Sequence, residues 1–118
     1  IDKRLQQLFN LYKPRRVGFE APFIGRNPLV ARFLICVDGK IEEVAARNGL
    51  MPDQISEVVS STAKKAMTGA GRIRGTTKEQ KTIMRQFAEQ RGYGDCTEHE
   101  ADAIAVGLVC IDNYLRGR

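Results

Sequence analysis

Acidic residues gather around the single histidine of this chain, in a polar stretch close to the C-terminal end. Asp95, Glu98, Glu100 and Asp102 lie within a few residues of His99. Carboxylate and imidazole groups are common ligands of divalent cations, and a bound cation can act on a phosphate group. We therefore consider a metal site here, against the simpler interpretation of a solvated helix face.

Glu20 is a candidate ligand-binding residue of a second kind, because it follows a short apolar run. Residues 16–19, Arg-Val-Gly-Phe, are expected to form a strand that Glu20 and Pro22 end. In α/β proteins, ligands bind at strand ends. A ligand-binding carboxylate and an ordinary loop carboxylate are both consistent with this position.

Positive charge is concentrated between residues 60 and 85, where Glu79 is the one acid. The basic residues there are Lys64, Lys65, Arg72, Arg74, Lys78, Lys81 and Arg85. One interpretation is that this tract holds a polyanion while the acidic cluster holds metal ions that act on it. The alternative is a pair of solvated helix faces, and charge alone favours this alternative.

Length and composition bound the class of protein. The chain has 118 residues, 42% of them hydrophobic, and a formal net charge of +5. These values suit one domain over residues 1–118. No apolar run is long enough to span a membrane, and no signal peptide is visible, so no membrane partner is expected. Three well-separated cysteines indicate a reduced, cytoplasmic protein, with Cys36 and Cys110 as core residues and Cys96 in a polar stretch.

Hydrophobic periodicity and capping signals predict seven elements. Their order is helix 2–12, strand 16–19, helix 28–48, strand 55–59, then three helices that begin near Ser60 or Ser61, at Thr77 and at Thr97. Residues 28–48 could instead form a hairpin around Asp38-Gly39, but a nearly continuous apolar stripe favours a helix. Two strands are too few for an α/β sheet. We therefore expect further strands before Ile1.

Three segments together resemble the RuvC family of Holliday-junction resolvases. They are Val17-Gly-Phe-Glu20-Ala-Pro-Phe23-Ile-Gly-Arg-Asn27, the glycine-bearing basic run Ala63-Lys64-Lys65-Ala-Met-Thr-Gly69-Ala-Gly71-Arg72 with Lys78-Glu-Gln80, and His99-Glu-Ala-Asp102-Ala-Ile-Ala105-Val. The resemblance covers nearly the whole chain and implies an α/β, ribonuclease H-like fold. It also implies that the chain is incomplete, because the leading strands with the family's first catalytic aspartate have no counterpart here.

The resemblance implies roles for particular residues. Glu20, His99 and Asp102 would be catalytic metal ligands for Mg²⁺, or for Mn²⁺, which a histidine ligand also suits. Positions three apart on a helix share a face, so His99 and Asp102 can converge on one ion. Glu100 is expected to cap the last helix and Glu98 to face solvent. The residues implied to bind DNA are Phe23, Arg26, Asn27, Lys64, Lys65, Arg72, Arg74 and Lys78, with Lys78 also catalytic.

Two of these DNA-binding residues carry alternatives. Phe23 would stack on a base near the junction point, or serve as an ordinary core residue. Arg74 lies in about three extra residues relative to the family, which leaves its correspondence open.

The expected function is that of a structure-selective DNA endonuclease of bacterial or phage origin. It would resolve four-way junctions by metal-dependent phosphodiester hydrolysis, in DNA recombination and repair, and would act as a homodimer because two opposing strands must be cut. The alternatives are a ribonuclease H-like nuclease for other branched DNA or hybrids, and a catalytically inactive module that binds junctions.

Overall fold

The computed structural model describes residues 2–22 and 27–117, which form two compact units. The first unit covers residues 1–57 and the second covers residues 58–118. The assignment of residues 1–118 to a single domain stays a prediction. Within the described residues, every helix is too short or too polar to cross a membrane.

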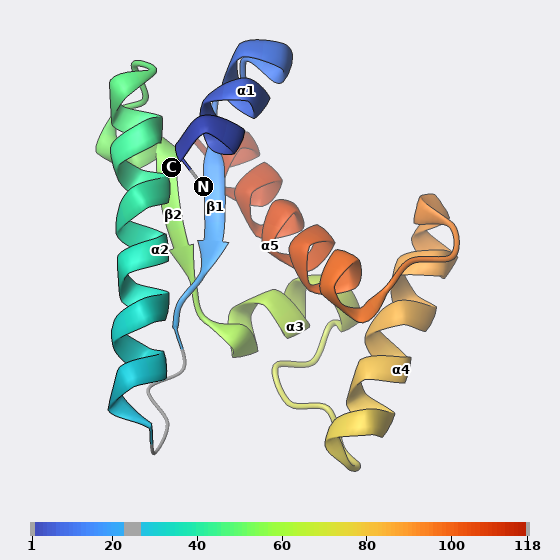
Figure 1. The fold of residues 1–118 in the computed structure, drawn as a ribbon. Helices are drawn as coiled ribbons and strands as arrows, with labels where there is room; N and C mark the ends of the chain where they lie inside the picture. Colours follow the sequence, from blue (N-terminus) through green and yellow to red (C-terminus); the bar gives the residue numbers. More distant parts are fainter. Residues whose placement is uncertain (1, 23–26, 118) are drawn as a thin grey trace. The chain divides into compact units, whose positions relative to one another are not determined.

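The first unit contains two helices and a small parallel sheet (Figure 1). Its elements are α1 (Asp2–Tyr12), β1 (Val17–Glu20), α2 (Pro28–Arg47), the short 3-10 helix η1 (Pro52–Gln54) and β2 (Ile55–Val58), which pairs with β1 and leads into the second unit. Both strands were predicted to within one residue at each end. Because two strands alone seldom form a stable sheet, the helices carry most of the packing here.

Packing in the first unit centres on Phe9 of α1 and on Val44 and Ala45 of α2, which are buried. Asp2 lies in the first turn of α1, and one of its carboxylate oxygens is 2.7 Å from the Arg47 guanidinium. Tyr12, at the other end of α1, is 71% exposed. An ion pair between the start of α1 and the end of α2 thus accompanies the apolar packing of this unit.

α2 is a continuous helix, so the hairpin around Asp38-Gly39 is excluded. The Asn27 side chain caps its start, accepting hydrogen bonds from the backbone N–H groups of Leu29 (3.0 Å) and Val30 (3.4 Å). The predicted apolar stripe is buried only toward the C-terminal half. In the N-terminal half, Leu29 and Phe33 are exposed, which leaves an apolar surface on this helix.

The second unit is helical. It contains α3 (Ser60–Thr68), α4 (Thr77–Ala88), the π-helical turn η2 (Glu89–Tyr93) and α5 (Glu98–Leu115). α5 packs against both α3 and α4. The buried core of this unit consists of Val58, Ala63, Met67, Ile73, Met84, Ala88, Cys96, Ala101, Ala105 and Val106. Small alanines on α5 let the other helices approach closely, so the unit needs few large side chains.

The predicted helix starts in the second unit are close but not all correct. Val59 is the N-cap residue of α3, and its side chain makes no capping hydrogen bond. Neither Ser60 nor Ser61 is therefore the cap. Thr76 rather than Thr77 caps α4, accepting a hydrogen bond from the Glu79 N–H. Ala103 of α5 is exposed, although it lies in an apolar run. A neighbouring residue of similar type can take the cap, which shifts a boundary by one position.

The prediction that Cys36 is a core residue is wrong. Cys36 is exposed on α2, whereas Cys96 is buried in the core of the second unit; Cys110 is buried as expected. The sequence did not indicate the burial of Cys96, because its neighbours Asp95 and Thr97 are polar and exposed. All three thiols are free.

Candidate functional site

β1 places Glu20 at its C-terminal end. Phe19, the residue before it, is buried, and Glu20 is exposed. Alternation along the strand explains this arrangement, because successive side chains point to opposite faces. The sequence therefore predicted both the strand and the terminal carboxylate correctly. The role of Glu20 as a metal ligand stays a prediction.

α5 presents His99 and Asp102 in its first turns. Thr97 caps the helix and forms a capping box with Glu100, with hydrogen bonds of 3.1 and 3.0 Å. The predicted capping role of Glu100 is confirmed. His99 and Asp102 follow at helical spacing, and both are exposed. An imidazole and a carboxylate one turn apart are therefore available to the same ligand.

The surroundings of Asp102 oppose its ionisation. Partial removal from water raises the pKa of this carboxyl, and the negative charge of Glu98 acts in the same direction. The charges of His99, Lys64 and Lys81 act in the opposite direction and do not outweigh the desolvation. A divalent cation bound at this carboxyl would act in the opposite direction to the desolvation and favour the ionised form.

Glu98 does not face solvent freely, contrary to expectation. It is half-buried, and the Lys81 ammonium lies 3.3 Å from each of its carboxylate oxygens. The His99 Nε2 atom is 3.8 Å from the same carboxylate. The competition between Glu98 and Asp102 for a ligand role is thus reduced, because Glu98 already has a cationic partner.

The fit of a metal ion to these residues is partial. Across residues 2–22 and 27–117, no group of three or more His, Cys, Asp and Glu side chains lies close enough to hold one ion. His99 and Asp102 have suitable donor atoms and open access, so they fit an ion as two ligands of a larger set. Glu20 lies in the other unit, which is described separately.

The predicted DNA-binding residues of the second unit lie on α3, on the following loop and on α4. Lys65, Arg72, Arg74 and Lys78 are exposed. Lys64 is half-buried and lies 3.4 Å from the Gln80 side-chain oxygen. The loop is held at its centre by Ile73, which is 8% exposed and belongs to the core. Burial of Ile73 directs its two arginine neighbours outward.

A hollow of about 540 Å³ lies at this loop, lined by Arg72, Ile73, Arg74, Gly75 and Gln80. The Gln80 amide donates a 3.0 Å hydrogen bond to the Gly75 carbonyl, which ties the end of the loop to α4. Gly75 has a φ of +110°, and a Cβ there would meet the Glu79 side chain. The loop is therefore fixed at several points and presents guanidinium groups at a concave surface.

Three predicted residues lie in the segment that joins β1 to α2. Asn27 uses its side-chain oxygen to cap α2. Phe23 and Arg26 lie outside the described residues.

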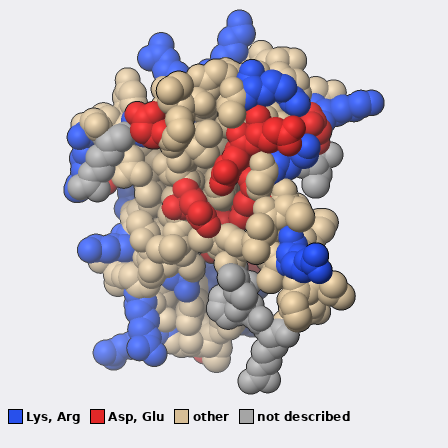
Figure 2. All heavy atoms as spheres, turned by 90° about the vertical axis from the view of Figure 1, so that its left-hand side faces the viewer, with Lys and Arg blue, Asp and Glu red and all other residues tan. Residues whose placement is uncertain are grey.

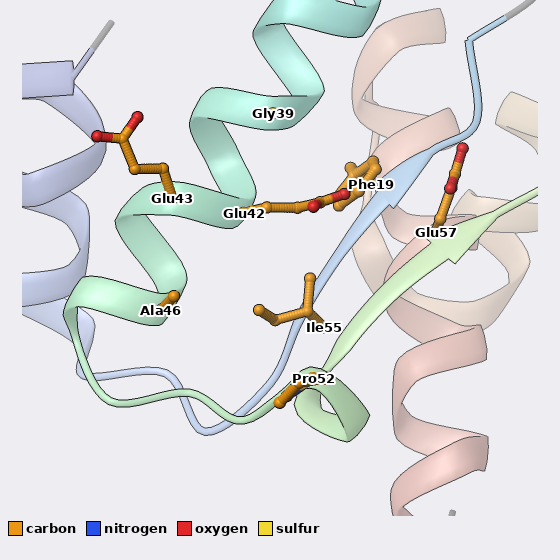
Figure 3. A pocket seen from close by; sticks show the side chains of 8 residues that line it. All are labelled: Phe19, Gly39, Glu42, Glu43, Ala46, Pro52, Ile55 and Glu57. Carbon is orange, nitrogen blue, oxygen red and sulfur yellow. The ribbon is translucent and has the colours of Figure 1, made fainter.

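A second hollow, of about 570 Å³, lies in the first unit between α2 and the sheet (Figure 3). Glu42, Glu43 and Glu57 line it, together with Phe19 and Ile55. Acidic side chains gather on the face that α2 presents (Figure 2). Negative charge repels phosphate, so this part of the first unit is a poor surface for DNA.

Sequence reasoning did not single out Lys81 and Arg85 as site residues. The Arg85 Nε atom donates a 2.8 Å hydrogen bond to the Cys96 carbonyl, and a terminal nitrogen lies 3.4 Å from the Asp95 carboxylate. The sequence carries a partial signal. Lys81 and Arg85 are four residues apart and so share one face of a helix, and the acidic residues Asp95 and Glu98 follow near the start of the next helix. The pairing itself depends on how α4 and α5 pack.

Comparison with known proteins finds the fold. No family model matches the sequence, and no curated protein matches it. Two solved structures match closely in three dimensions. The first is described as Thermus thermophilus RuvC in complex with Holliday junction substrate, with 21% sequence identity and a TM-score of 0.70 over 98% of this chain. The second, described as the Thermus thermophilus RuvC structure, has 20% identity and a TM-score of 0.64 over 98% of this chain.

These likenesses define the class of fold. The chain has a mixed α/β fold, mostly helical, similar to that of RuvC. It spans 66% of the chain of the first structure and 65% of that of the second. The expected α/β class is confirmed as a likeness to the RuvC fold, and the expectation that leading strands are missing stays a prediction.

Proposed function

We propose that this chain is the greater part of a structure-selective DNA endonuclease that resolves four-way junctions by metal-dependent phosphodiester hydrolysis. The observation that carries the proposal is the open His99 and Asp102 pair at the start of α5, in a chain whose fold is similar to that of RuvC. An imidazole and a carboxylate alone would be weak support, and the fold alone would be weaker. Together they favour a nuclease in DNA recombination and repair.

His99 and Asp102, with Glu20, would hold Mg²⁺ or Mn²⁺. When bound, such ions supply an activated water and stabilise the leaving oxygen of a phosphodiester. The protein side chains bind and orient the substrate. Lys64, Lys65 and Lys78 would contact backbone phosphates, and the Lys78 ammonium would also offset charge that develops on the phosphate during reaction.

Arg72 and Arg74 would extend this contact along the backbone. Both flank the buried Ile73, so their guanidinium groups are presented from a fixed loop rather than a mobile one. Guanidinium groups can bind phosphate oxygens in a bidentate manner. Phe23, Arg26 and Asn27 would meet DNA at the other unit, where Phe23 would stack on a base.

The partner would be branched DNA, and the active form would be a homodimer. A four-way junction has two opposing strands to cut, which requires two active sites. The exposed apolar side chains of the N-terminal half of α2 support this part of the proposal: Leu29, Val30, Phe33 and Ile35 are at least half exposed. A second copy of the chain would cover such a surface. Three free thiols support action in the reducing cytoplasm of a bacterium, for a bacterial or phage gene.

The test is cleavage of a synthetic four-way junction by the product of the complete gene with Mg²⁺. Glu20→Gln and Asp102→Asn should each reduce the rate by about a hundredfold or more, while junction binding persists. Asp112→Asn is a matched control, because Asp112 is an exposed acid on the same helix that pairs with Arg116. Variants of Glu20 and Asp102 that cut as fast as the parent would refute the assignment.

A second candidate is a module that binds junctions without cutting them. It is favoured by the finding that the described residues hold no group of three or more metal-ligating side chains. This candidate predicts junction binding that persists in EDTA and no nicking with any divalent metal. Parallel assays on flaps and RNA–DNA hybrids test a third possibility, a nuclease of the same fold with another substrate.

A further inference from the structure

α4 holds the segment that leads into α5. The Arg85 Nε atom donates to the Cys96 carbonyl at 2.8 Å, and the same guanidinium reaches Asp95 at 3.4 Å. The Cys96 side chain is 7% exposed and belongs to the buried core. The residue just before the Thr97 cap is therefore held both through its carbonyl and through its side chain.

Lys81, one turn earlier on α4, makes a second tie to the same region. Its ammonium pairs with Glu98, the first residue of α5, at 3.3 Å. Both side chains of this pair are partly exposed, and exposed ion pairs contribute little. The Arg85 bond is shorter, is part-buried and has a charged donor, so it should dominate.

We propose that Arg85, assisted by Lys81, is a positioning residue for the metal ligands His99 and Asp102. This inference rests on the proposed function. His99 is 89% exposed and gains almost no orientation from packing. Its direction, and that of Asp102, follows from where the backbone of α5 begins. Groups that orient metal ligands from outside the ligand set commonly change metal affinity substantially when they are removed.

α4 also contributes to the basic surface, which is formed by the predicted DNA-binding residues of the second unit, Lys64, Lys65, Arg72, Arg74 and Lys78. α4 carries Lys78 and Gln80. The Gln80 side chain accepts a hydrogen bond from Lys64 and donates one to the Gly75 carbonyl, at the end of the loop that carries Arg72 and Arg74, here called the arginine loop. Phosphate-binding residues and the ties to α5 thus share one rigid element. DNA held by the basic surface would be placed in a fixed relation to the ligands of α5.

The single histidine supplies a direct readout. In this chain the imidazole proton resonances belong to His99 alone, and paramagnetic Mn²⁺ broadens them when it binds nearby. The measurement is the Mn²⁺ concentration that gives half of the maximal broadening. Arg85→Met should raise it about tenfold. Arg85→Lys should not restore it, because a lysine ammonium cannot reach both Cys96 and Asp95 in the geometry of the guanidinium.

Arg91→Met is the matched control. Arg91 also donates to backbone carbonyls, those of Ala66 (3.0 Å) and Met67 (3.0 and 3.2 Å), but it ties η2 to α3 rather than to α5. Both methionine variants should lower the thermal midpoint. Only the Arg85 variant should weaken Mn²⁺ binding when measured well below both midpoints. The inference is overturned if the Mn²⁺ concentration for half-maximal broadening rises equally in both variants. It is also overturned if that concentration for Arg85→Met stays within about twofold of the parent value.

Two further variants separate the possible failures. If Asp102→Asn leaves the broadening unchanged, the proposed ligands are wrong whatever Arg85 does. If Asp102→Asn abolishes the broadening and Arg85→Met does not weaken it, the positioning role alone is refuted. Should Arg85→Met not fold, Arg85→Lys decides, since it keeps the charge and the aliphatic stem: a rise of about tenfold supports the inference and no rise overturns it.

Discussion

Thr97 and Glu100 satisfy each other's backbone N–H groups at the start of α5. The Thr97 hydroxyl accepts from the Glu100 N–H at 3.1 Å, and the Glu100 carboxylate accepts from the Thr97 N–H at 3.0 Å. These hydrogen bonds, the one to the Thr97 backbone first, hold the pKa of Glu100 below its usual value. The carboxylate is thereby committed to the helix, so His99 and Asp102 are left as the ligand candidates of this turn.

Loss of the cap should destabilise the second unit without removing a ligand. Thr97→Ala removes the hydroxyl acceptor and should cost about 1 kcal/mol in the free energy of unfolding. Thr97→Ser keeps the acceptor and should lie close to the parent. Urea unfolding followed by circular dichroism measures both. Equal stability of the alanine and serine variants would contradict the capping role.

Asp38 should limit stability at neutral pH. Its Oδ2 atom is buried and has no hydrogen-bond partner among the described residues. Desolvation, followed by the charges of Glu57 and Glu42, raises the pKa of this carboxyl. Ionisation is therefore less favourable in the folded chain than in the unfolded chain, so the folded state is destabilised above the raised pKa.

Asp38→Asn should accordingly stabilise the protein at pH 7, by about 0.5–1 kcal/mol. The gain should shrink as the pH falls through the raised pKa toward the usual carboxyl value, because the parent then takes up the proton in its folded state. Unfolding midpoints between pH 3 and 8 measure this. Asp53→Asn, at an exposed residue of η1, is the control. A gain that does not depend on pH would exclude the electrostatic cause.

The arginine loop should contribute to DNA affinity through phosphate contacts. Replacement of Arg72 or Arg74 by Gln should weaken junction binding and reduce the slope of log affinity against log salt concentration by about 1. Arg4→Gln, at an exposed residue of α1, should leave the slope unchanged. Fluorescence anisotropy with a labelled junction over a range of NaCl concentrations gives the slopes. An unchanged slope for both loop variants would exclude the loop from the interface.

The helices could be predicted from the sequence because their signals are local. Apolar spacing identified α2 against a competing hairpin, and the Thr97 to Glu100 spacing identified the start of α5. Prediction failed where burial depends on partners far along the chain. Cys96 lies among polar residues, yet it is buried in the core to which residues of α3, α4 and α5 contribute. Exposed Cys36 shows the converse case within an apolar run.

The candidate site divides in the same way. The shared helix face of His99 and Asp102 was predictable, because three residues along a helix return to the same face, whereas their role as metal ligands stays a prediction. Lys81 and Arg85 were not predicted as partners of Glu98 and Cys96, since such contacts follow from the crossing of two helices. A backbone carbonyl, such as the one that Arg85 binds, leaves no trace in side-chain patterns. Contacts of this kind are therefore harder to find from sequence than residues that share a helix face.

The apolar surface of α2 should mediate self-association of the complete protein. Phe33 is 64% exposed in the N-terminal half of this helix, beside other exposed apolar residues. Phe33→Glu places a charge where a second copy would exclude water, and an unpaired buried charge is strongly unfavourable. Sedimentation velocity should show a dimer for the parent and a monomer for the variant.

Tyr12→Glu is the control. It alters a comparably exposed aromatic residue of α1, 71% exposed, and should leave the dimer intact. If Phe33→Glu remains dimeric, α2 is not the interface, and the pairing of two active sites must be sought on another surface.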